Sequence, residues 1–327
     1  MNPSNNLAQA DLQLRFADLS FKKNFQLKDL TYFKVGGPAE CYVEVSEKNR
    51  LADLLAYCSR VGVKTTILGG ASNVVVSEAG IRGLVIKYLC DDFKVLYTKS
   101  DQSTGLVTVY AASGLKTSLL VRKTIDLELG GLEYFLGVPG SLGGAIYNNA
   151  HYLTHLISEY IDQVEIIDED FKIVWIDKAD AKFAYDSSRF HHTKEVILGA
   201  NFVLPKTDPE KSRELLSKAT RYRAQTQPLG LPSSGCIFRN VANDEHLRKM
   251  FPQFAEADFV PGGFLIDKAG LKGVREGDIE VSQKHAAFFV NHGSGTAEDI
   301  KRLIEKVKSV VKEKFAVELQ EEVFWLE

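Results

Sequence analysis

The most glycine-dense stretch of the chain reads Gly137-Val138-Pro139-Gly140-Ser141-Leu142-Gly143-Gly144-Ala145. Small residues let a backbone approach an anionic ligand closely, and successive N–H groups can cradle a phosphate. A second stretch of this kind reads Gly69-Gly70-Ala71-Ser72-Asn73 and follows a short expected strand. Neither has the pattern of a P-loop or of a Rossmann fingerprint. Either loop alone is as readily a tight turn as a phosphate contact, whereas two loops in adjacent units favour a dinucleotide held between domains.

Length, composition and charge indicate a globular protein and exclude several other classes of protein. The chain has 327 residues, 45% of them hydrophobic and 25% charged, which is typical of a globular protein with two or three domains. A net charge of −3 argues against nucleic acid as the main partner. The four cysteines form no CxxC pair, so the sequence predicts reduced thiols, no metal site and a cytoplasmic protein. The polar start, MNPSNNLAQADLQLRF, is unlike a signal peptide, and no apolar run is long enough to suggest a membrane span.

Periodicity predicts mixed helices and strands along the whole chain. We expect strands at 31–39, 39–45, 106–111, 164–168, 173–177 and 196–204, and helices at 51–62, 115–129 and 208–225. Ser141 is a plausible N-cap of a short helix. Thr296 and Asp299 resemble a capping box before a long amphipathic helix, and a last strand is expected at 316–325.

A thiol follows a flexible residue in the stretch Pro232-Ser233-Ser234-Gly235-Cys236-Ile237-Phe238-Arg239-Asn240. The apolar pair after Cys236 predicts a strand, and Gly235 would let the chain aim the thiol into a cleft. Unpaired cysteines more often behave as small buried hydrophobes. The residues alone leave both interpretations of Cys236 open.

Further motifs accompany the two glycine-rich loops and residues 232–240 along the chain. They read Val35-Gly36-Gly37-Pro38-Ala39, Leu265-Ile266-Asp267-Lys268-Ala269-Gly270-Leu271-Lys272-Gly273, Val281-Ser282 with His285, and Glu322-Val323. In this order and spacing, the motifs resemble those of the UDP-N-acetylenolpyruvoylglucosamine reductase family. The resemblance covers residues 25–325, and the combination of motifs is highly specific.

The resemblance implies an α+β fold, in which a two-subdomain FAD-binding flavoprotein part (PCMH/VAO-like) is followed by an α+β substrate-binding domain. We expect an N-terminal arm at 1–25, FAD-binding subdomains at 26–94 and 95–207, and the substrate-binding domain at 208–327. FAD would be bound noncovalently, with NADPH as hydride donor. The implied cofactor-binding residues are Gly69, Gly70, Ala71, Ser72, Asn73, Gly137, Val138, Pro139, Gly140, Ser141 and Gly144.

The resemblance also implies roles in the second half-reaction, in which hydride reaches an enolpyruvyl ether and a neighbouring carbon is protonated. Cys236 stands where most members carry the proton-donating serine, and Glu322 matches a carboxylate near the substrate. A thiol is a competent general acid near neutral pH. The implied substrate-binding residues are Arg223, Arg239, Asn240, His285 and Tyr152.

Two positions depart from the family pattern. Asp186 replaces the arginine that pairs with the substrate carboxylate, and an aspartate would repel that group. Arg189, three residues on, is the candidate to take over this catalytic role. His151 follows Asn148-Asn149-Ala150, where the family usually has a Gly-Ala-Tyr-Gly turn, so His151 or Tyr152 would line the pocket differently.

The predicted function is the NADPH-dependent reduction of UDP-N-acetylglucosamine enolpyruvate to UDP-N-acetylmuramate in peptidoglycan precursor synthesis. Its partners would be the UDP-sugar and NADPH, without nucleic acid or membrane. A monomer is favoured, although the sequence does not fix the oligomeric state. One alternative is an FAD oxidoreductase of the same fold with a different substrate. The other is a catalytically weak, flavin-binding regulatory protein.

Overall fold

A computed structural model describes residues 11–96, 105–152 and 154–327. Their chain forms two compact units, each built from separate segments. Unit 1 contains residues 11–25, 39–70 and most of 82–222, and unit 2 contains 26–38, 71–81 and 223–327. This division differs from the predicted boundaries at 94/95 and 207/208. Two short segments from the first third of the chain pack with the C-terminal part, because their apolar side chains fill its core.

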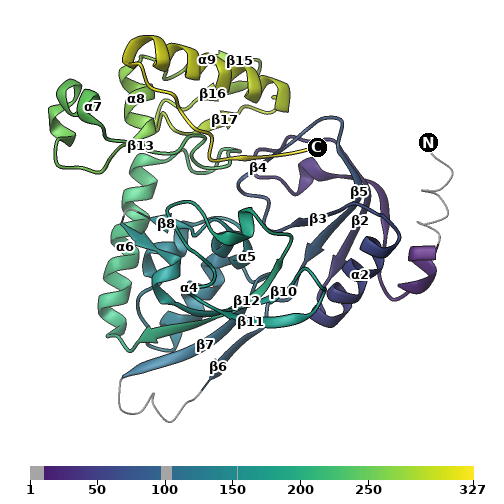
Figure 1. The fold of residues 1–327 in the computed structure, drawn as a ribbon. Helices are drawn as coiled ribbons and strands as arrows, with labels where there is room; N and C mark the ends of the chain where they lie inside the picture. Colours follow the sequence, from purple (N-terminus) through teal and green to yellow (C-terminus); the bar gives the residue numbers. More distant parts are fainter. Residues whose placement is uncertain (1–10, 97–104, 153) are drawn as a thin grey trace. The chain divides into compact units, whose positions relative to one another are not determined.

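The first sheet of unit 1 has the strand order β1-β2-β5-β3, and Figure 1 labels its strands β2, β5 and β3. Helix α2 buries Leu51, Leu54, Leu55 and Cys58, the i, i+3, i+4, i+7 pattern of an amphipathic helix. These side chains share a core with strands β2 and β5. The elements are β1 (Lys22–Gln26), β2 (Pro38–Val45), α2 (Lys48–Arg60), β3 (Thr65–Leu68) and β5 (Ile81–Tyr88).

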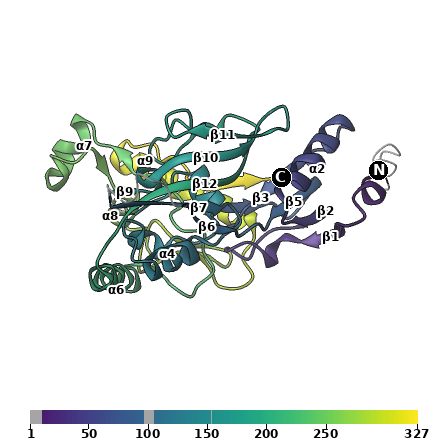
Figure 2. The same cartoon turned by 90° about the horizontal axis from the view of Figure 1, so that it is seen from below.

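The second sheet of unit 1 has the order β11-β10-β12-β7-β6, and its neighbouring strands pair antiparallel (Figure 2). Its central strand β12 is almost continuously apolar because Ile197 and Leu198 enter different cores. The predicted hairpin is confirmed: Asp168 Oδ1 accepts hydrogen bonds from the backbone N–H groups of Asp170 and Lys172 in its turn. The strands are β6 (Phe93–Leu96), β7 (Leu106–Ala112), β10 (Ile161–Ile167), β11 (Ile173–Asp177) and β12 (Val196–Pro205).

Short helices and a small hairpin complete unit 1. Helix α5 packs on β12 and β7, and helix α4 packs on α5 and η2, so these helices share the core of the second sheet. Helix α6, predicted at 208–225, is confirmed. The elements are α4 (Thr117–Asp126), η2 (Glu133–Gly137), α5 (Leu142–Tyr147), β8 (His151–Tyr152), β9 (His155–Leu156), η3 (Ile157–Tyr160), η4 (Arg189–His191) and α6 (Pro209–Thr226).

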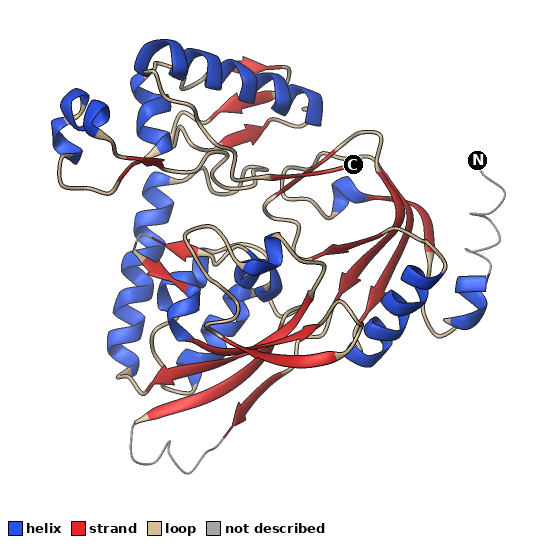
Figure 3. Cartoon of the chain, in the orientation of Figure 1, coloured by secondary structure: helices blue, strands red, loops and turns tan. Residues whose placement is uncertain are grey.

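Unit 2 is organised around helix α9, which buries Ile300, Leu303, Ile304, Val307 and Val311 along one face. Phe33, Val35 and Val75 from the two early segments enter the same core. Helices and strands are mixed here as in unit 1 (Figure 3). The elements are η1 (Leu27–Asp29), β4 (Val74–Val76), β13 (Val241–Ala242), α7 (Glu245–Met250), η5 (Pro252–Phe254), β14 (Phe259–Val260), α8 (Gly262–Lys268), β15 (Arg275–Glu276), β16 (Ile279–Val281), β17 (Phe289–Asn291), α9 (Ala297–Phe315) and β18 (Phe324–Leu326).

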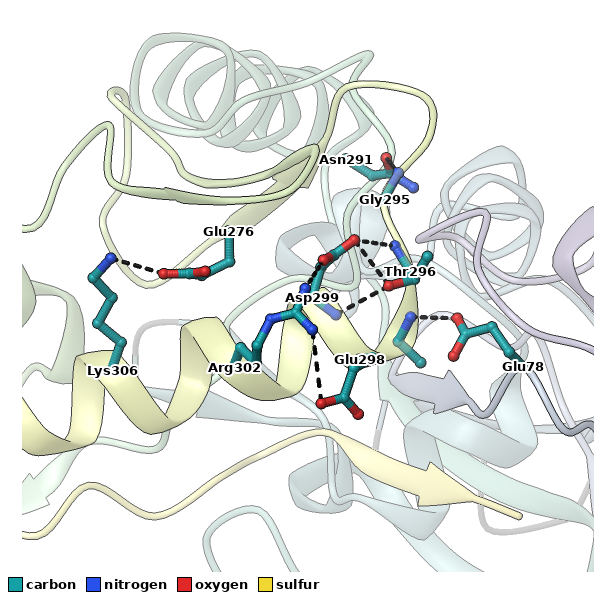
Figure 4. A network of polar contacts seen from close by, with 10 residues as sticks. Glu78, Glu276, Asn291, Gly295, Thr296, Glu298, Asp299, Arg302 and Lys306 are labelled. Atoms are coloured by element: carbon teal, nitrogen blue, oxygen red, sulfur yellow. Dashed lines mark hydrogen bonds and ion pairs between the residues drawn. The ribbon is translucent and has the colours of Figure 1, made fainter.

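A polar network surrounds the start of α9 (Figure 4). The predicted capping box is confirmed: Asp299 N–H donates to Thr296 Oγ1 at 3.1 Å, and Thr296 N–H donates to Asp299 Oδ2 at 2.9 Å. The backbone N–H of Ala297 donates to the carboxylate of Glu78. Because Glu78 directly follows the β4 segment, this bond ties the early segment 71–81 to the helix.

Loss of the cap should destabilise the protein measurably. Thr296→Ala removes the hydroxyl that accepts from Asp299 N–H, at an expected cost of about 1 kcal/mol. Glu298→Ala, on the same turn, removes only an exposed pair with Arg302 and should cost less than about 0.5 kcal/mol. Thermal unfolding followed by circular dichroism compares the two variants. Equal melting temperatures would contradict the role of the cap.

Three predicted elements differ in the structure. Residues 31–37 form a loop, not a strand: Thr31 Oγ1 donates to Val35 O at 2.8 Å, and Phe33 and Val35 turn into the core. The last strand is confined to β18, because Ala316 adopts a left-handed conformation with φ 55° and ends α9. In the predicted arm, the described Leu12 and Phe16 are buried in the core of α2.

Candidate flavin and substrate sites

The two glycine-rich loops contact each other in unit 1. Gly70 N–H donates a hydrogen bond to Ser141 Oγ at 3.1 Å. A Cβ atom on Gly70 would lie 2.3 Å from Gly140 Cα, and one on Gly69 would lie 2.8 Å from Ser141 Oγ. The loops therefore meet at a spacing that only glycine allows. Ser141 does occupy the N-cap position of α5, as predicted, but its hydroxyl links the loops and makes no capping bond.

The first loop runs from unit 1 into unit 2 at Gly70 and Ala71. Ala71 has a positive φ of 53°, which is unusual for a residue other than glycine. Within unit 2, Ala71 O accepts from Tyr32 N–H at 3.2 Å, and Asn73 Nδ2 donates to Glu322 O at 3.1 Å. The loop is thus held at its second half by the backbone of residues that belong to unit 2.

The Cys236 segment lies between two other extended segments of unit 2. It is not the predicted regular strand but pairs through isolated bridges, Cys236 with Phe288 and Phe238 with Glu321. Ile237 N–H donates to Ala287 O, and Glu322 N–H donates to Ile237 O, both at 2.8 Å. The structure therefore brings the backbone at Cys236 close to the segments that carry His285 and Glu322. Gly235, with φ 86°, provides the predicted flexible turn before the thiol.

Buried polar atoms without hydrogen-bond partners gather in the same segment. Among the described residues, the hydroxyls of Ser233 and Ser234 and Nε of Arg239 have none. Ser234 is only 4% exposed. Leaving such groups unsatisfied is costly, so their donors fit an oxygen-rich ligand. The sequence contained the two serines, but only burial without partners distinguishes them from ordinary loop residues.

His285 and Asn240 stand at the edges of this segment. Burial lowers the pKa of His285, and the nearby charge of Lys272 lowers it further. The ring is therefore neutral near pH 7, with Nδ1 positioned to accept from Ala287 N–H at 3.3 Å. Asn240 Oδ1 accepts from Gly262 N–H at 3.3 Å, the first residue of α8. Arg223 is 9% exposed, and its Nη1 donates to Gln227 Oε1 at 3.4 Å.

Arg189 is engaged with another part of unit 1. Its Nε and Nη2 donate to the two carboxylate oxygens of Glu195 at 2.9 and 2.6 Å, and Nη1 donates to Asp180 O at 3.2 Å. The Arg189 guanidinium thus forms a bidentate ion pair with Glu195, whose side chain is only 6% exposed, and such a pair holds the guanidinium firmly in place. The guanidinium of Arg189 is engaged by Glu195, and its role at a substrate carboxylate stays a prediction.

Asp186 and His151, the two departures from the family pattern, are in direct contact. His151 Nδ1 lies 2.8 Å from Asp186 Oδ1, and Tyr185 OH lies 3.2 Å from His151 Nε2. Tyr152, the neighbouring candidate, is 7% exposed and stacks near Tyr134. The sequence marked both departures but gave no sign that they meet.

Two classes of site have no support in the part of the chain that the structure describes. In residues 11–96, 105–152 and 154–327, no three His, Cys, Asp or Glu side chains are grouped to hold a metal ion. Over the same ranges, no helix has both the length and the apolar character of a membrane span.

Comparison with known proteins identifies both parts of the chain. Residues 39–177 match the family model described as FAD binding domain. Residues 227–326 match the model described as UDP-N-acetylenolpyruvoylglucosamine reductase, C-terminal domain. The first region contains the Gly70–Ser141 contact, and the second contains Cys236, His285 and Glu322.

Relatives match nearly the whole chain. UDP-N-acetylenolpyruvoylglucosamine reductase of Clostridium novyi (strain NT) is 35% identical over 306 residues, which are 92% of this chain and 91% of that protein. The enzyme of the same name from Caldicellulosiruptor bescii is 33% identical over 316 residues, 96% of this chain and 93% of that protein.

A solved structure agrees. The crystal structure of UDP-N-acetylenolpyruvylglucosamine reductase from Thermus caldophilus matches with a TM-score of 0.72 and 26% identity, covering 94% of this chain and 99% of that one. The predicted α+β fold, with an FAD-binding part followed by a substrate-binding domain, is confirmed. The chain belongs to the UDP-N-acetylenolpyruvoylglucosamine reductase family.

Proposed function

We propose that the chain reduces UDP-N-acetylglucosamine enolpyruvate to UDP-N-acetylmuramate with NADPH, as a step of peptidoglycan precursor synthesis. The observation that carries the proposal is the Cys236 segment, which pairs on one side with the strand end near His285 and on the other with Glu322. A potential acid, a neutral imidazole and a carboxylate-bearing residue thus belong to one small region of unit 2. Family membership over both the FAD-binding and the reductase regions supports the same reaction.

The glycine-rich loops fit a noncovalently bound FAD. The Gly70–Ser141 contact brings together two backbone stretches without side-chain bulk, which suits close approach to a diphosphate. When bound, FAD supplies a two-electron carrier that accepts hydride from NADPH and returns it to the enolpyruvyl group. The residues proposed to hold it are Gly69, Gly70, Ala71, Ser72, Asn73, Gly137, Val138, Pro139, Gly140, Ser141 and Gly144.

Cys236 is the proposed general acid. Hydride addition to the terminal carbon of the enolpyruvyl ether leaves an enolate. The carbon next to that terminal carbon must then be protonated. The thiol gives that proton and becomes a thiolate, which takes up another proton from solvent before the next turnover. A thiol with an ordinary pKa near 8.5 is largely protonated at neutral pH and can donate readily.

The remaining residues position the substrate. Arg223, Arg239 and Asn240 supply donors that suit a diphosphate, and the unpartnered hydroxyls of Ser233 and Ser234 add two more. Glu322 is proposed to stabilise the enol form of the intermediate. His285 and Tyr152 complete the set of proposed substrate contacts.

One assay tests the function. The purified protein, reconstituted with FAD, should oxidise NADPH rapidly only when UDP-N-acetylglucosamine enolpyruvate is present, with one NADPH consumed per UDP-N-acetylmuramate formed. Absorbance of NADPH and mass spectrometry of the product measure the two sides. Flavin reduction by NADPH without conversion of that substrate would contradict the proposal. It would favour the same-fold oxidoreductase with a different substrate, for which the Asp186–His151 contact is the specific motive.

We place the protein in the cytoplasm as a monomer. The cytoplasmic location is supported by its four free cysteines, Cys41, Cys58, Cys90 and Cys236, because disulfides are rare in that compartment. The monomeric state stays a prediction, which light scattering of the FAD-loaded protein would test.

A further inference from the structure

A close contact between an imidazole and a buried carboxylate in unit 1 joins the two residues that depart from the family pattern. His151 Nδ1 lies 2.8 Å from Asp186 Oδ1, with the side chain of Asp186 only 6% exposed. The other carboxylate oxygen is buried and has no hydrogen-bond partner among the described residues. A carboxylate in such surroundings is a costly structural element, because its desolvation is only partly offset. Its position therefore calls for a functional reason.

The backbone around the pair is held in strained conformations. Tyr185 and Asp186 form the tip of a tight turn, in which Ala184 N–H donates to Ser187 O at 3.0 Å. Asp186 has a left-handed φ of 50°, and Asn149, two residues before His151, has φ 46°. Such conformations persist only where the surroundings enforce them, and they cluster at functional sites.

A buried amide fixes the turn next to His151. Asn149 is fully buried, and its Nδ2 donates to Ala184 O at 2.8 Å, while its Oδ1 accepts from Ser158 N–H at 3.2 Å. The Asn149 amide thus binds both the turn that contains Tyr185 and Asp186 and the segment after the β8–β9 hairpin. Hydrogen bonds between the buried Asn149 amide and the backbone therefore hold in place both segments that carry His151 and Asp186.

His151 and Tyr185 present two polar atoms side by side. Tyr185 OH lies 3.2 Å from His151 Nε2, and the two ring centroids are 4.7 Å apart. The contact of Nδ1 with Asp186 orients the ring, and an imidazole that carries protons on both nitrogens can donate from Nε2 as well. The two groups form a hydrogen bond with each other, and a ligand carboxylate bound here would replace that bond by accepting from both.

We propose that His151 and Tyr185 bind the carboxylate of the enolpyruvyl group, with Asp186 as the positioning residue that orients the imidazole. The inference rests on the proposed function, which supplies a substrate with that carboxylate. The guanidinium of Arg189, by contrast, is bound to Glu195. Asp186 would repel the substrate carboxylate by itself, but here it contacts and orients the imidazole that is proposed to bind that carboxylate.

Ligand binding to the FAD-loaded protein tests the assignment. The two probes are UDP-N-acetylglucosamine enolpyruvate and UDP-N-acetylglucosamine, which lacks the enolpyruvyl carboxylate. Dissociation constants are measured from the change in flavin absorbance, and KM and kcat from NADPH oxidation. His151→Gln is expected to weaken binding of the enolpyruvyl probe roughly 10- to 100-fold, since hydrogen bonds to charged groups carry such an effect, and to leave binding of UDP-N-acetylglucosamine unchanged.

Two further variants separate positioning from direct contact. Asp186→Asn keeps the shape but removes the charge, so KM for the enolpyruvyl substrate should rise while the rate of flavin reduction by NADPH stays the same. Tyr185→Phe removes one hydroxyl and should weaken the enolpyruvyl probe less than His151→Gln does. His155→Gln is the matched control, because His155 lies in the same hairpin but stacks on Tyr134.

The outcomes distinguish this inference from the proposed function. If the wild-type protein converts the enolpyruvyl substrate but the His151, Asp186 and Tyr185 variants bind both probes as tightly as it does, the carboxylate assignment is wrong. Equal weakening of both probes would likewise overturn it, because the effect would not depend on the carboxylate. A wild-type protein that does not convert the substrate overturns the proposed function. Should His151→Gln fail to fold, Tyr185→Phe gives the same comparison with the loss of a single atom.

Discussion

Cys236→Ala is expected to lower turnover of the enolpyruvyl sugar nucleotide by about 10²- to 10⁴-fold, the usual contribution of a positioned general acid. The half-reaction in which NADPH reduces the bound flavin should keep its wild-type rate, because no proton from Cys236 is needed there. The variant would therefore show a normal flavin reduction followed by a slow return to the oxidised state. Rapid-mixing absorbance measurements observe the two phases separately.

The structure indicates that Cys236→Ala removes the thiol and leaves the backbone contacts of its segment in place. Cys236 is only partly buried, and its segment is held through backbone bonds of Ile237 and Glu322 that alanine retains. The loss of activity should therefore occur without a large loss of stability. Cys236→Ser is the informative companion, because serine is the residue that the family usually carries here and its hydroxyl also donates a proton. We expect it to retain much more turnover than alanine does.

Cys90→Ala is the matched control, because Cys90 is the other partly exposed thiol of the chain and belongs to unit 1. It should leave both half-reactions unchanged. A Cys236→Ala protein with wild-type turnover would show that water or another group supplies the proton. That result would remove the assigned role of Cys236 and leave the family membership untouched.

Local patterns in the sequence predicted the regular parts of the fold well. Helix α2, the β10–β11 hairpin and the capping box of α9 follow from spacing and from residues that act on near neighbours. The strand expected at 31–39 failed for a different reason. The apolar residues Phe33 and Val35 are drawn into a core made by residues more than 200 positions later, so tertiary packing overrode their local preference.

The candidate site shows the same limit. The glycine-rich loops could be recognised from composition, but their mutual contact at Gly70 and Ser141 joins residues 71 positions apart. Ser141 carried a familiar N-cap signal, yet its hydroxyl is used for that contact. The exchange of an arginine for Asp186 was visible, whereas its pairing with His151 depends on how a turn and a hairpin are brought together. Sequence spacing alone favoured Arg189, because it could not show that the guanidinium of this residue is bound to Glu195.

Gly70→Ala should disrupt the flavin site more than an added methyl group at Gly69, Gly143 or Gly144 would. The new Cβ would lie 2.3 Å from Gly140 Cα and 2.6 Å from Ser141 N, and backbone atoms cannot move aside as a flexible side chain can. We expect the two loops to separate and the Gly70–Ser141 hydrogen bond to break. Overpacking of this kind typically costs about 1–3 kcal/mol of folding stability. Loops that are displaced in this way should also bind FAD more weakly.

Gly144→Ala is the matched comparison, because the nearest atom to its added Cβ is Ser141 Oγ at 3.9 Å. Gly144 lies inside α5, where alanine is the better helix former by about 1 kcal/mol. The FAD-free Gly144→Ala protein should therefore melt at or above the wild-type temperature, whereas the FAD-free Gly70→Ala protein should melt below it. Equal melting temperatures of these two variants would contradict the close packing of the loops.

FAD affinity then separates packing from ligand contact. Titration of each FAD-free protein, followed by flavin fluorescence, gives the dissociation constant. Weaker binding by Gly70→Ala together with a lower melting temperature is the expected signature of displaced loops. Weaker binding by Gly144→Ala at an unchanged melting temperature would place that glycine against the flavin nucleotide itself, because the protein alone has room for the methyl group. Wild-type affinity in both variants would mean that neither loop holds FAD, and the proposed cofactor site would have to be abandoned.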